Sequence, residues 1–223
     1  MPTLPMTYPE DVLSRVRRSL GRTAPLAAPP VPPTIIEHVT RLVHSDIGLP
    51  ELFARRAADN KMHPEFVSPE EVGPKVAELL KAKGLTKVML PDSPLLERLG
   101  VAAACRAAGL DVKLWSELTL DSSYEMDVAV TDVTWAIAET GSLVIKPSAA
   151  HGRAISLVPP VHVAIVEPKN CVADLIDLMD TLDKQGVGRN VTIITGPSKT
   201  ADIEGALVVG VHGPGEVYTF VLQ

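Results

Sequence analysis

Between residues 65 and 115, short apolar segments alternate with segments of helical periodicity, and this alternation restricts the fold more than any other feature of the chain. The expected strands are residues 65–67, 87–90 and 111–115, and the expected helices are residues 68–84 and 93–109. Strands separated by helices at this spacing pair in parallel through right-handed crossovers. We therefore expect an α/β fold with a mostly parallel central sheet that is flanked by helices.

The second half of the chain continues with shorter elements. We expect strands at residues 127–130, 143–145, 154–158, 161–166 and 191–195, and two more strands around a His-Gly-Pro-Gly turn at residues 212–215. Residues 133–138 indicate one or two helical turns, and residues 172–182 indicate a helix. In that helix the apolar residues recur at helical spacing, so we expect a core-facing stripe made of Leu175, Ile176, Met179 and Leu182.

The first 33 residues differ from the rest and are expected to form an appendage. Residues 7–20 combine a capping-box spacing with an apolar stripe, which predicts a short amphipathic helix. Its three arginines indicate a solvated face rather than a membrane surface or an acidic partner. Residues 23–33 are too rich in proline for regular hydrogen-bonded structure and form a linker. We expect residues 34–223, beginning with a helix at 34–43, to form one α/β domain.

Composition argues against several classes of protein. The 223 residues are 46% apolar but only 4% aromatic, and the net charge is −6, which does not suit nucleic acid as a partner. No apolar run approaches the roughly 20 residues that cross a bilayer, and the N-terminus lacks the pattern of a secretory signal. We expect a cytoplasmic protein with no membrane span.

The small number of cysteines limits the metal chemistry. Cys105 and Cys171 are expected to be reduced thiols, and an iron–sulfur cluster takes about four cysteine thiolates, so this chain alone cannot hold one. No two of the six histidines have the spacing of a helical metal site, and His162 is expected to be a hydrogen-bonded core residue. The sequence also lacks the Gly-x-Gly-x-x-Gly and Gly-Lys-Ser/Thr phosphate loops. We expect no metal and no cofactor on this chain.

The loop that follows residues 191–195 is the first candidate site. An apolar strand, expected to be buried, stops there at a Gly-Pro break and is followed by closely spaced polar side chains. The candidate ligand-binding residues are Gly196, Ser198, Lys199, Thr200, Asp202 and Glu204. Ligands in open α/β sheets collect at the carboxyl ends of strands. The two carboxylates share a face on a strand but not on a helix, and they have the alternative role of satisfying free amides of the loop.

The turn at residues 139–142 is the second candidate site. Thr140, Gly141 and Ser142 supply two hydroxyls and unobstructed backbone amides, the components of an anion-binding nest, with Glu139 beside them. The same four residues also suit an ordinary turn. Further candidate anion ligands are Arg153, in the loop at residues 151–153, and His212, in the last turn, although turn geometry alone explains the glycines and proline around His212.

Four segments in order resemble the LUD-domain family, specifically its members with a role in lactate utilization. They are AETGSLV at residues 138–144, LVPPVHVA at 157–164, GPSKTADIE at 196–204 and GVHGP at 210–214, and the resemblance spans roughly residues 35–223. It implies a fold related to the ribose-phosphate isomerase, glucosamine-phosphate deaminase and coenzyme A transferase group. It also implies a role in bacterial oxidation of L-lactate to pyruvate, beside two iron–sulfur partner subunits.

Two hypotheses about function follow. In the first, the chain is a non-redox subunit that binds a small anion for the complex or organises the partners, because lactate oxidation needs an electron acceptor that this chain lacks. In the second, it is an enzyme acting on a phosphorylated or coenzyme A thioester substrate, with Glu139 as acid, base or nucleophile and Lys199 holding the anion. The candidate ligands are lactate, pyruvate, phosphate and a coenzyme A ester. Both hypotheses place the two candidate loops at one end of a sheet.

Overall fold

The computed structural model describes residues 9–22, 24, 28, 31, 33–34, 36, 41–43, 47–186, 188, 190–203 and 206–223. The chain divides into two compact units, Met1–Thr40 and Arg41–Gln223. In the first unit, α1 (Pro9–Ser19) lies within the helix predicted at residues 7–20, and its apolar side chains Val12, Leu13 and Val16 are about half exposed. The division predicted at residue 33 stays a prediction.

The helix predicted at residues 34–43 is not found where the structure describes this segment. Residues 34, 36 and 41–43 are irregular, and the remaining positions lie outside the described residues. In the second unit, the guanidinium of Arg41 donates a hydrogen bond to the Asp177 carboxylate at 2.7 Å. This long-range contact holds Arg41 against helix α8 (Leu175–Gln185). A local capping pattern in the sequence does not reveal such a contact.

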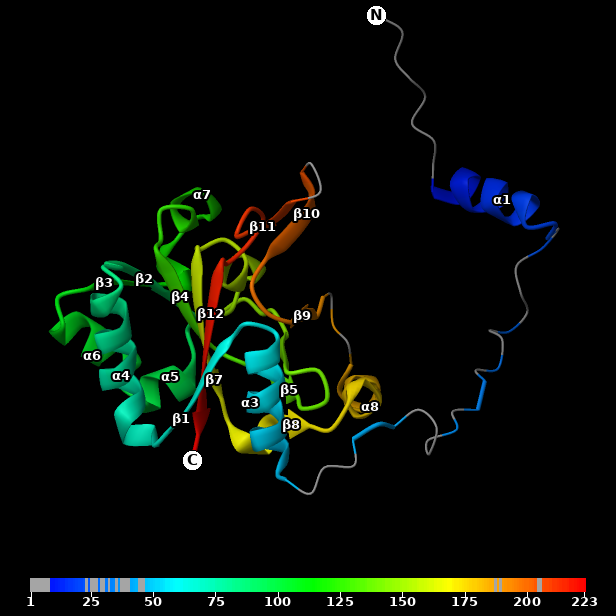
Figure 1. The fold of residues 1–223 in the computed structure, drawn as a ribbon. Helices are drawn as coiled ribbons and strands as arrows, with labels where there is room; N and C mark the ends of the chain where they lie inside the picture. The colour runs from blue at the N-terminus through cyan, green and yellow to red at the C-terminus, as the bar shows by residue number, and fades with distance from the viewer. Residues whose placement is uncertain are drawn as a thin grey trace, which may run out of the picture. The chain divides into compact units, whose positions relative to one another are not determined.

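The second unit is built on a six-stranded parallel sheet with the strand order β1-β12-β7-β4-β2-β3 (Figure 1). Its strands are β1 (His63–Val67), β2 (Lys87–Leu90), β3 (Asp111–Leu114), β4 (Val128–Asp132), β7 (Val161–Val166) and β12 (Glu216–Leu222). All neighbouring strands pair in parallel. The predicted α/β fold with a mostly parallel central sheet and flanking helices is confirmed.

Helices α4 (Pro69–Ala82), α5 (Pro94–Arg98) and α6 (Val101–Ala107) cover one face of this sheet (Figure 1). The predicted start of α4 is confirmed, because Ser68 and Glu71 form a capping box. The single helix predicted at residues 93–109 is wrong, since Gly100 adopts a left-handed φ of 65° and divides it into α5 and α6. Glycine takes this conformation without steric cost, so the chain can turn there.

The opposite face packs on α3 (Leu49–Asp59) and on a second sheet with the order β8-β5-β6-β9 (Figure 1). The strands of this sheet are β5 (Trp135–Ile137), β6 (Ser142–Ile145), β8 (Cys171–Val172) and β9 (Thr192–Ile194). One apolar cluster joins the layers and includes Phe53 of α3, Leu143 of β6 and Val166 of β7. The helix α8 (Leu175–Gln185) covers the far face of the second sheet through Leu178 and Leu182.

Several predictions in the second half are wrong because they depend on tertiary pairing. Residues 133–138 contain strand β5 instead of helical turns, since Trp135 and Ile137 face α8 and Ala136 faces the core. Residues 154–158 do not form a strand; Arg153–Ser156 is a short 3-10 turn, η2, ahead of two prolines that lack backbone donors. In α8 the predicted core residues Leu175 and Met179 are 47% and 53% exposed.

The two strands predicted on either side of residues 212–215 are confirmed, but they do not pair with each other. β11 (Ala206–Val209) pairs with β10 (Lys199–Ile203) in an antiparallel hairpin, whereas β12 pairs in parallel with β1 and β7 in the main sheet. β9 lies at an edge of the second sheet, and Ile193 is 45% exposed, so the prediction that this strand is buried is wrong. No helix in the described part of the chain is long and apolar enough to cross a membrane.

Candidate functional site

The turn that contains Glu139 and the loop that begins at Gly196 lie at the same end of the strands of the second sheet. β6 is antiparallel to both β5 and β9, so the carboxyl ends of β5 and β9 point in the same direction. The hydroxyl of Ser142 is 2.7 Å from the Thr140 hydroxyl and 2.7 Å from the Thr195 hydroxyl. The structure therefore brings the two predicted loops together through a chain of three hydroxyl groups.

Both glycines of these loops pack tightly against the carboxyl end of α3. A Cβ at Gly141, whose φ is 65°, would lie 2.3 Å from the backbone nitrogen of Ala57. A Cβ at Gly196 would lie 2.5 Å from the backbone oxygen of Asn60. The side-chain NH₂ group of Asn60 also donates a hydrogen bond to the Thr140 carbonyl at 2.7 Å. The amide of Gly141 donates to the Ile137 carbonyl at 2.9 Å. These contacts join the second sheet to α3 and use groups that an anion nest would need.

Asn60 takes part in both of these contacts, and sequence reasoning did not select it. It follows α3 as its C-cap residue with a φ of −81°, so nothing local marks it. Glu139 itself is half-buried, and its amide donates to the Ala173 carbonyl at 2.9 Å. No hydrogen bond or ion pair joins the described atoms of Glu139 and Lys199.

The remaining residues of the Gly196 loop lie beside the last turn before β12. The amide of Ser198 donates to the Pro214 carbonyl, and the amide of Gly210 donates to the Ser198 carbonyl, both at 2.8 Å. Lys199 and Thr200 begin β10, with Lys199 exposed opposite Val209. Asp202 also lies on β10, His212 is exposed, and Glu204 lies outside the described residues. Backbone hydrogen bonds thus join the Ser198 loop to the two ends of the segment that contains His212.

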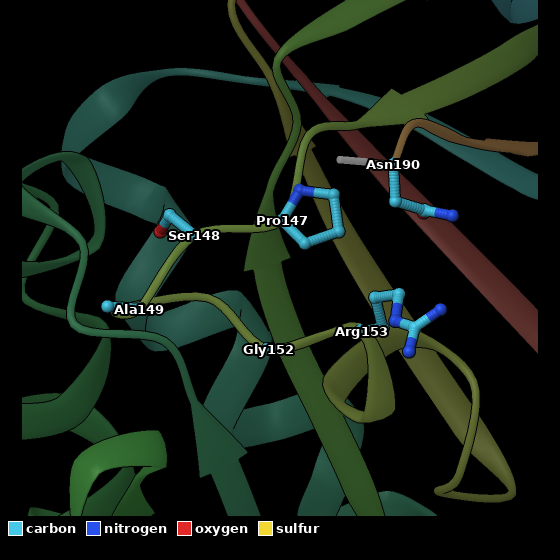
Figure 2. Close-up of a pocket in the computed structure, with 6 residues that line it drawn as sticks. All are labelled: Pro147, Ser148, Ala149, Gly152, Arg153 and Asn190. Carbon is cyan, nitrogen blue, oxygen red and sulfur yellow. The ribbon is translucent and has the colours of Figure 1, made fainter. Parts of the chain in front are cut away.

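Arg153 lies at a separate place, in a cavity of about 520 Å³. We call it the Arg153 pocket; its lining residues are Pro147, Ser148, Ala149, Gly152, Arg153 and Asn190 (Figure 2). Figure 2 shows the guanidinium of Arg153 and the side-chain amide of Asn190 on the same side of the Pro147 ring. The Asn190 carbonyl oxygen accepts a hydrogen bond from the Thr192 hydroxyl at 3.2 Å, which leaves its NH₂ group to donate.

The strand register places the Arg153 pocket away from the Glu139 turn. Ile145, at the end of β6, pairs with Thr192 at the start of β9, and Pro147 and Asn190 extend from these two ends. Ser142 begins β6 at the opposite end of the strand, and the four residues of β6 span roughly 13 Å at the usual rise per residue. The predicted site residues therefore fall into three groups: the Glu139 turn with Gly196, the Ser198–His212 region, and the Arg153 pocket.

The backbone fold around the Arg153 pocket is stabilised from both sides. The Ser148 amide donates to the His151 carbonyl at 2.9 Å, which closes a tight turn. A Cβ at Gly152 would lie 2.1 Å from the ring of Trp115, so only glycine lets the chain pass this indole. The Lys146 ammonium donates to the Gly186 carbonyl at 2.6 Å and adds positive charge beside the pocket. Sequence reasoning selected Arg153 but missed Pro147 and Asn190, which only the pairing of β6 and β9 brings near it.

Beneath this turn, several polar side chains are buried against the main sheet. His162 is fully buried, and its Nε2 atom lies 2.9 Å from the Thr131 hydroxyl, which confirms the prediction of a hydrogen-bonded core histidine. Burial lowers the pKa of His162 to about 3, so the imidazole is neutral at pH 7. Burial also lowers the pKa of His151, against the opposing effect of the Asp132 carboxylate. Burial therefore favours the uncharged form of both imidazoles.

The cysteines and acidic groups give no sign of a metal centre in the described part. Cys105 is buried and Cys171 half-buried, both are free thiols, and burial raises the pKa of each to about 11. No group of three or more His, Cys, Asp or Glu side chains among the described residues could hold a metal ion.

Comparison with known proteins gives consistent similarities. A family model described as the LUD domain matches residues 50–222. Lactate utilization protein C of Bacillus subtilis is 28% identical, with 92% of each chain covered, and the protein of the same name from Geobacillus kaustophilus is 33% identical over about 60% of each chain. The crystal structure of a DUF162 family protein from Deinococcus radiodurans has a TM-score of 0.59 at 23% identity, covering 78% of this chain and 96% of the other. The last similarity shows the fold.

Proposed function

We propose that this chain, which belongs to the LUD domain family, takes part in lactate utilization in the bacterial cytoplasm. The observation that carries the proposal is the match with lactate utilization protein C of Bacillus subtilis, which covers 92% of both chains. A match of this extent must include part of the first 33 residues as well as the α/β unit, because residues 34–223 alone make up less than 92% of the chain. Relatives with the same name and 26% identity cover 96% and 94% of this chain, which supports the same proposal.

Within that process we propose the role of a non-redox subunit in the oxidation of L-lactate to pyruvate. The reaction releases two electrons, so it needs an acceptor. Two cysteines are too few for an iron–sulfur cluster, which takes about four thiolates. We therefore assign the electron carriers to iron–sulfur partner subunits, and to this chain the binding of a small anionic ligand or the organisation of the complex.

The proposal can be tested by growth. A strain that lacks this chain should grow normally on pyruvate and poorly or not at all on L-lactate as sole carbon source. The wild-type chain, supplied from a plasmid, should restore growth on L-lactate. Normal growth on L-lactate without the chain would refute the proposed function.

The Glu139→Gln variant in the same strain distinguishes two roles for the carboxylate. Because the Glu139 turn packs against α3, we expect the isosteric amide to fold and to support growth on L-lactate. Loss of growth with a folded Gln variant would instead favour proton transfer or covalent chemistry at this position.

A further inference from the structure

We propose that the Arg153 pocket binds 2-hydroxy monocarboxylates whose apolar side chains are longer than the methyl group of lactate. This inference rests on the proposed function, because a protein of lactate utilization meets 2-hydroxy acids, and it goes further by naming a site and a ligand class. Three observations support it: a cation without a partner among the described residues, a second donor on the same side of the Pro147 ring (Figure 2), and the size of the cavity.

Arg153 differs from the cations at the other described pockets, because it has no hydrogen-bond or ion-pair partner among the described residues. At the pocket between β1 and α4, Lys75 forms an ion pair with Glu65. At the pocket beside the start of α4, Glu167 is shared by Arg98 at 3.3 Å and Lys169 at 3.1 Å. The guanidinium of Arg153 forms no hydrogen bond or ion pair with any described residue.

A free guanidinium beside a cavity suits a carboxylate. The planar fork of arginine donates two parallel hydrogen bonds to the two oxygens of one carboxylate. Among the described lining residues every side chain except Arg153 is neutral, so no described acidic group in the lining competes with the ligand. Arg153 is the one charged side chain of the described lining, which favours a ligand with one negative charge.

Asn190 supplies the second polar contact. Because its carbonyl oxygen is occupied by the Thr192 hydroxyl, the NH₂ group is the free part of the amide. It lies on the same side of the Pro147 ring as the guanidinium (Figure 2). We assign it to the oxygen on C2 of the ligand, which lies next to the carboxylate in every 2-hydroxy acid.

The size of the cavity favours a ligand larger than lactate. Its volume of about 520 Å³ falls in the range of roughly 300–1,000 Å³ that accommodates drug-sized molecules, whereas lactate has only three carbons. The Pro147 ring and the Ala149 side chain give the pocket aliphatic surface. A longer aliphatic side chain can displace water from this surface, and each buried methylene tightens binding by about fourfold.

The test is a calorimetric titration of the full chain with L-lactate, L-2-hydroxybutyrate and L-2-hydroxycaproate. We expect Kd to fall by about fourfold for each added methylene, or roughly 60-fold from the first acid to the last. Arg153→Met should weaken binding of every acid by roughly 10- to 100-fold. Because Arg153 is exposed, this variant should keep the wild-type circular dichroism spectrum and melting temperature.

Arg106→Met is the matched control. Arg106 is an exposed arginine near the end of α6, so its replacement removes the same charge outside the pocket and should leave Kd unchanged. Equal affinity along the acid series, no saturable binding, or wild-type affinity in Arg153→Met would each overturn the proposal. Tighter binding of inorganic phosphate than of the longest acid would also overturn it, in favour of a phosphate site. Growth on L-lactate is measured separately. If the acids bind as expected but a strain without this chain still grows normally on L-lactate, the proposed function is refuted while the proposed binding site is supported.

Discussion

Acidification should destabilise this protein through one buried imidazole. His162 is fully buried, with one ring nitrogen bonded to Thr131 and the other without a partner in the described part. Its pKa is about 3 in the folded protein, against a value of about 6.5 for an unfolded chain. The unfolded state therefore binds a proton that the folded state does not bind, and the free energy of unfolding falls as the pH drops from about 6.5 towards 3.

The size of the effect follows from the two pKa values. Between pH 7.5 and pH 5.0 the unfolded imidazole gains most of a proton while the folded one gains almost none, which removes about 2 kcal/mol of stability. For a chain of this length, that corresponds to a decrease of roughly 4–8 °C in melting temperature. Carboxylates with low pKa values add their own losses only at lower pH, so the interval from 7.5 to 5.0 isolates the histidines.

The assay is urea unfolding at pH 7.5 and pH 5.0, followed by circular dichroism, for the wild type and for His162→Gln. The variant removes the titrating group but keeps an amide able to bond to Thr131, so it should lose about 2 kcal/mol less than the wild type over this interval. NMR of the imidazole protons should show no titration of His162 in the folded protein above pH 5. Equal pH dependence in the two proteins, or a titration near pH 6.5, would refute the reasoning.

Two further predictions concern packing, and both are measured by urea unfolding. Gly141→Ala should cost about 2–4 kcal/mol because its Cβ would meet the Ala57 backbone, whereas Gly84→Ala, with a similar φ of 68° but open space, should cost only about 1 kcal/mol; equal costs would contradict the packing of the Glu139 turn on α3. Leu178→Ala should cost about 2–4 kcal/mol and Leu175→Ala less than about 0.5 kcal/mol, since the first is buried and the second 47% exposed; the reverse order would show that α8 is rotated.

Strands β1, β2 and β3 of the main sheet and helix α4 were predictable because their signals are local. Ser68 and Glu71 mark the start of α4, and strands 87–90 and 111–114 stand between helices of clear periodicity. In each case residues that are close in the sequence indicate both the type of element and the position where it begins or ends. Parallel pairing then follows from the length of the crossover.

The second sheet was not predictable from such signals. Residues 133–138 are too short for periodicity to separate helix from strand, and only the pairing of Ala136 with Leu143 decides the outcome. In the main sheet the position of β12 between β1 and β7 was not predictable either, because it joins residues far apart in the sequence. The predicted site residues are separated for the same reason. Arg153 and Glu139 are near in sequence, but strand β6 runs between them, so they lie at opposite ends of that strand.

The most direct test of the proposed function is lactate oxidation in extracts. An extract of the strain that lacks this chain is supplied with L-lactate and an artificial electron acceptor, and pyruvate formation is measured before and after the purified chain is added. We predict little pyruvate without the chain and recovery of the wild-type rate once it is added. The same rate with and without the chain would contradict the proposal that it works in lactate utilization.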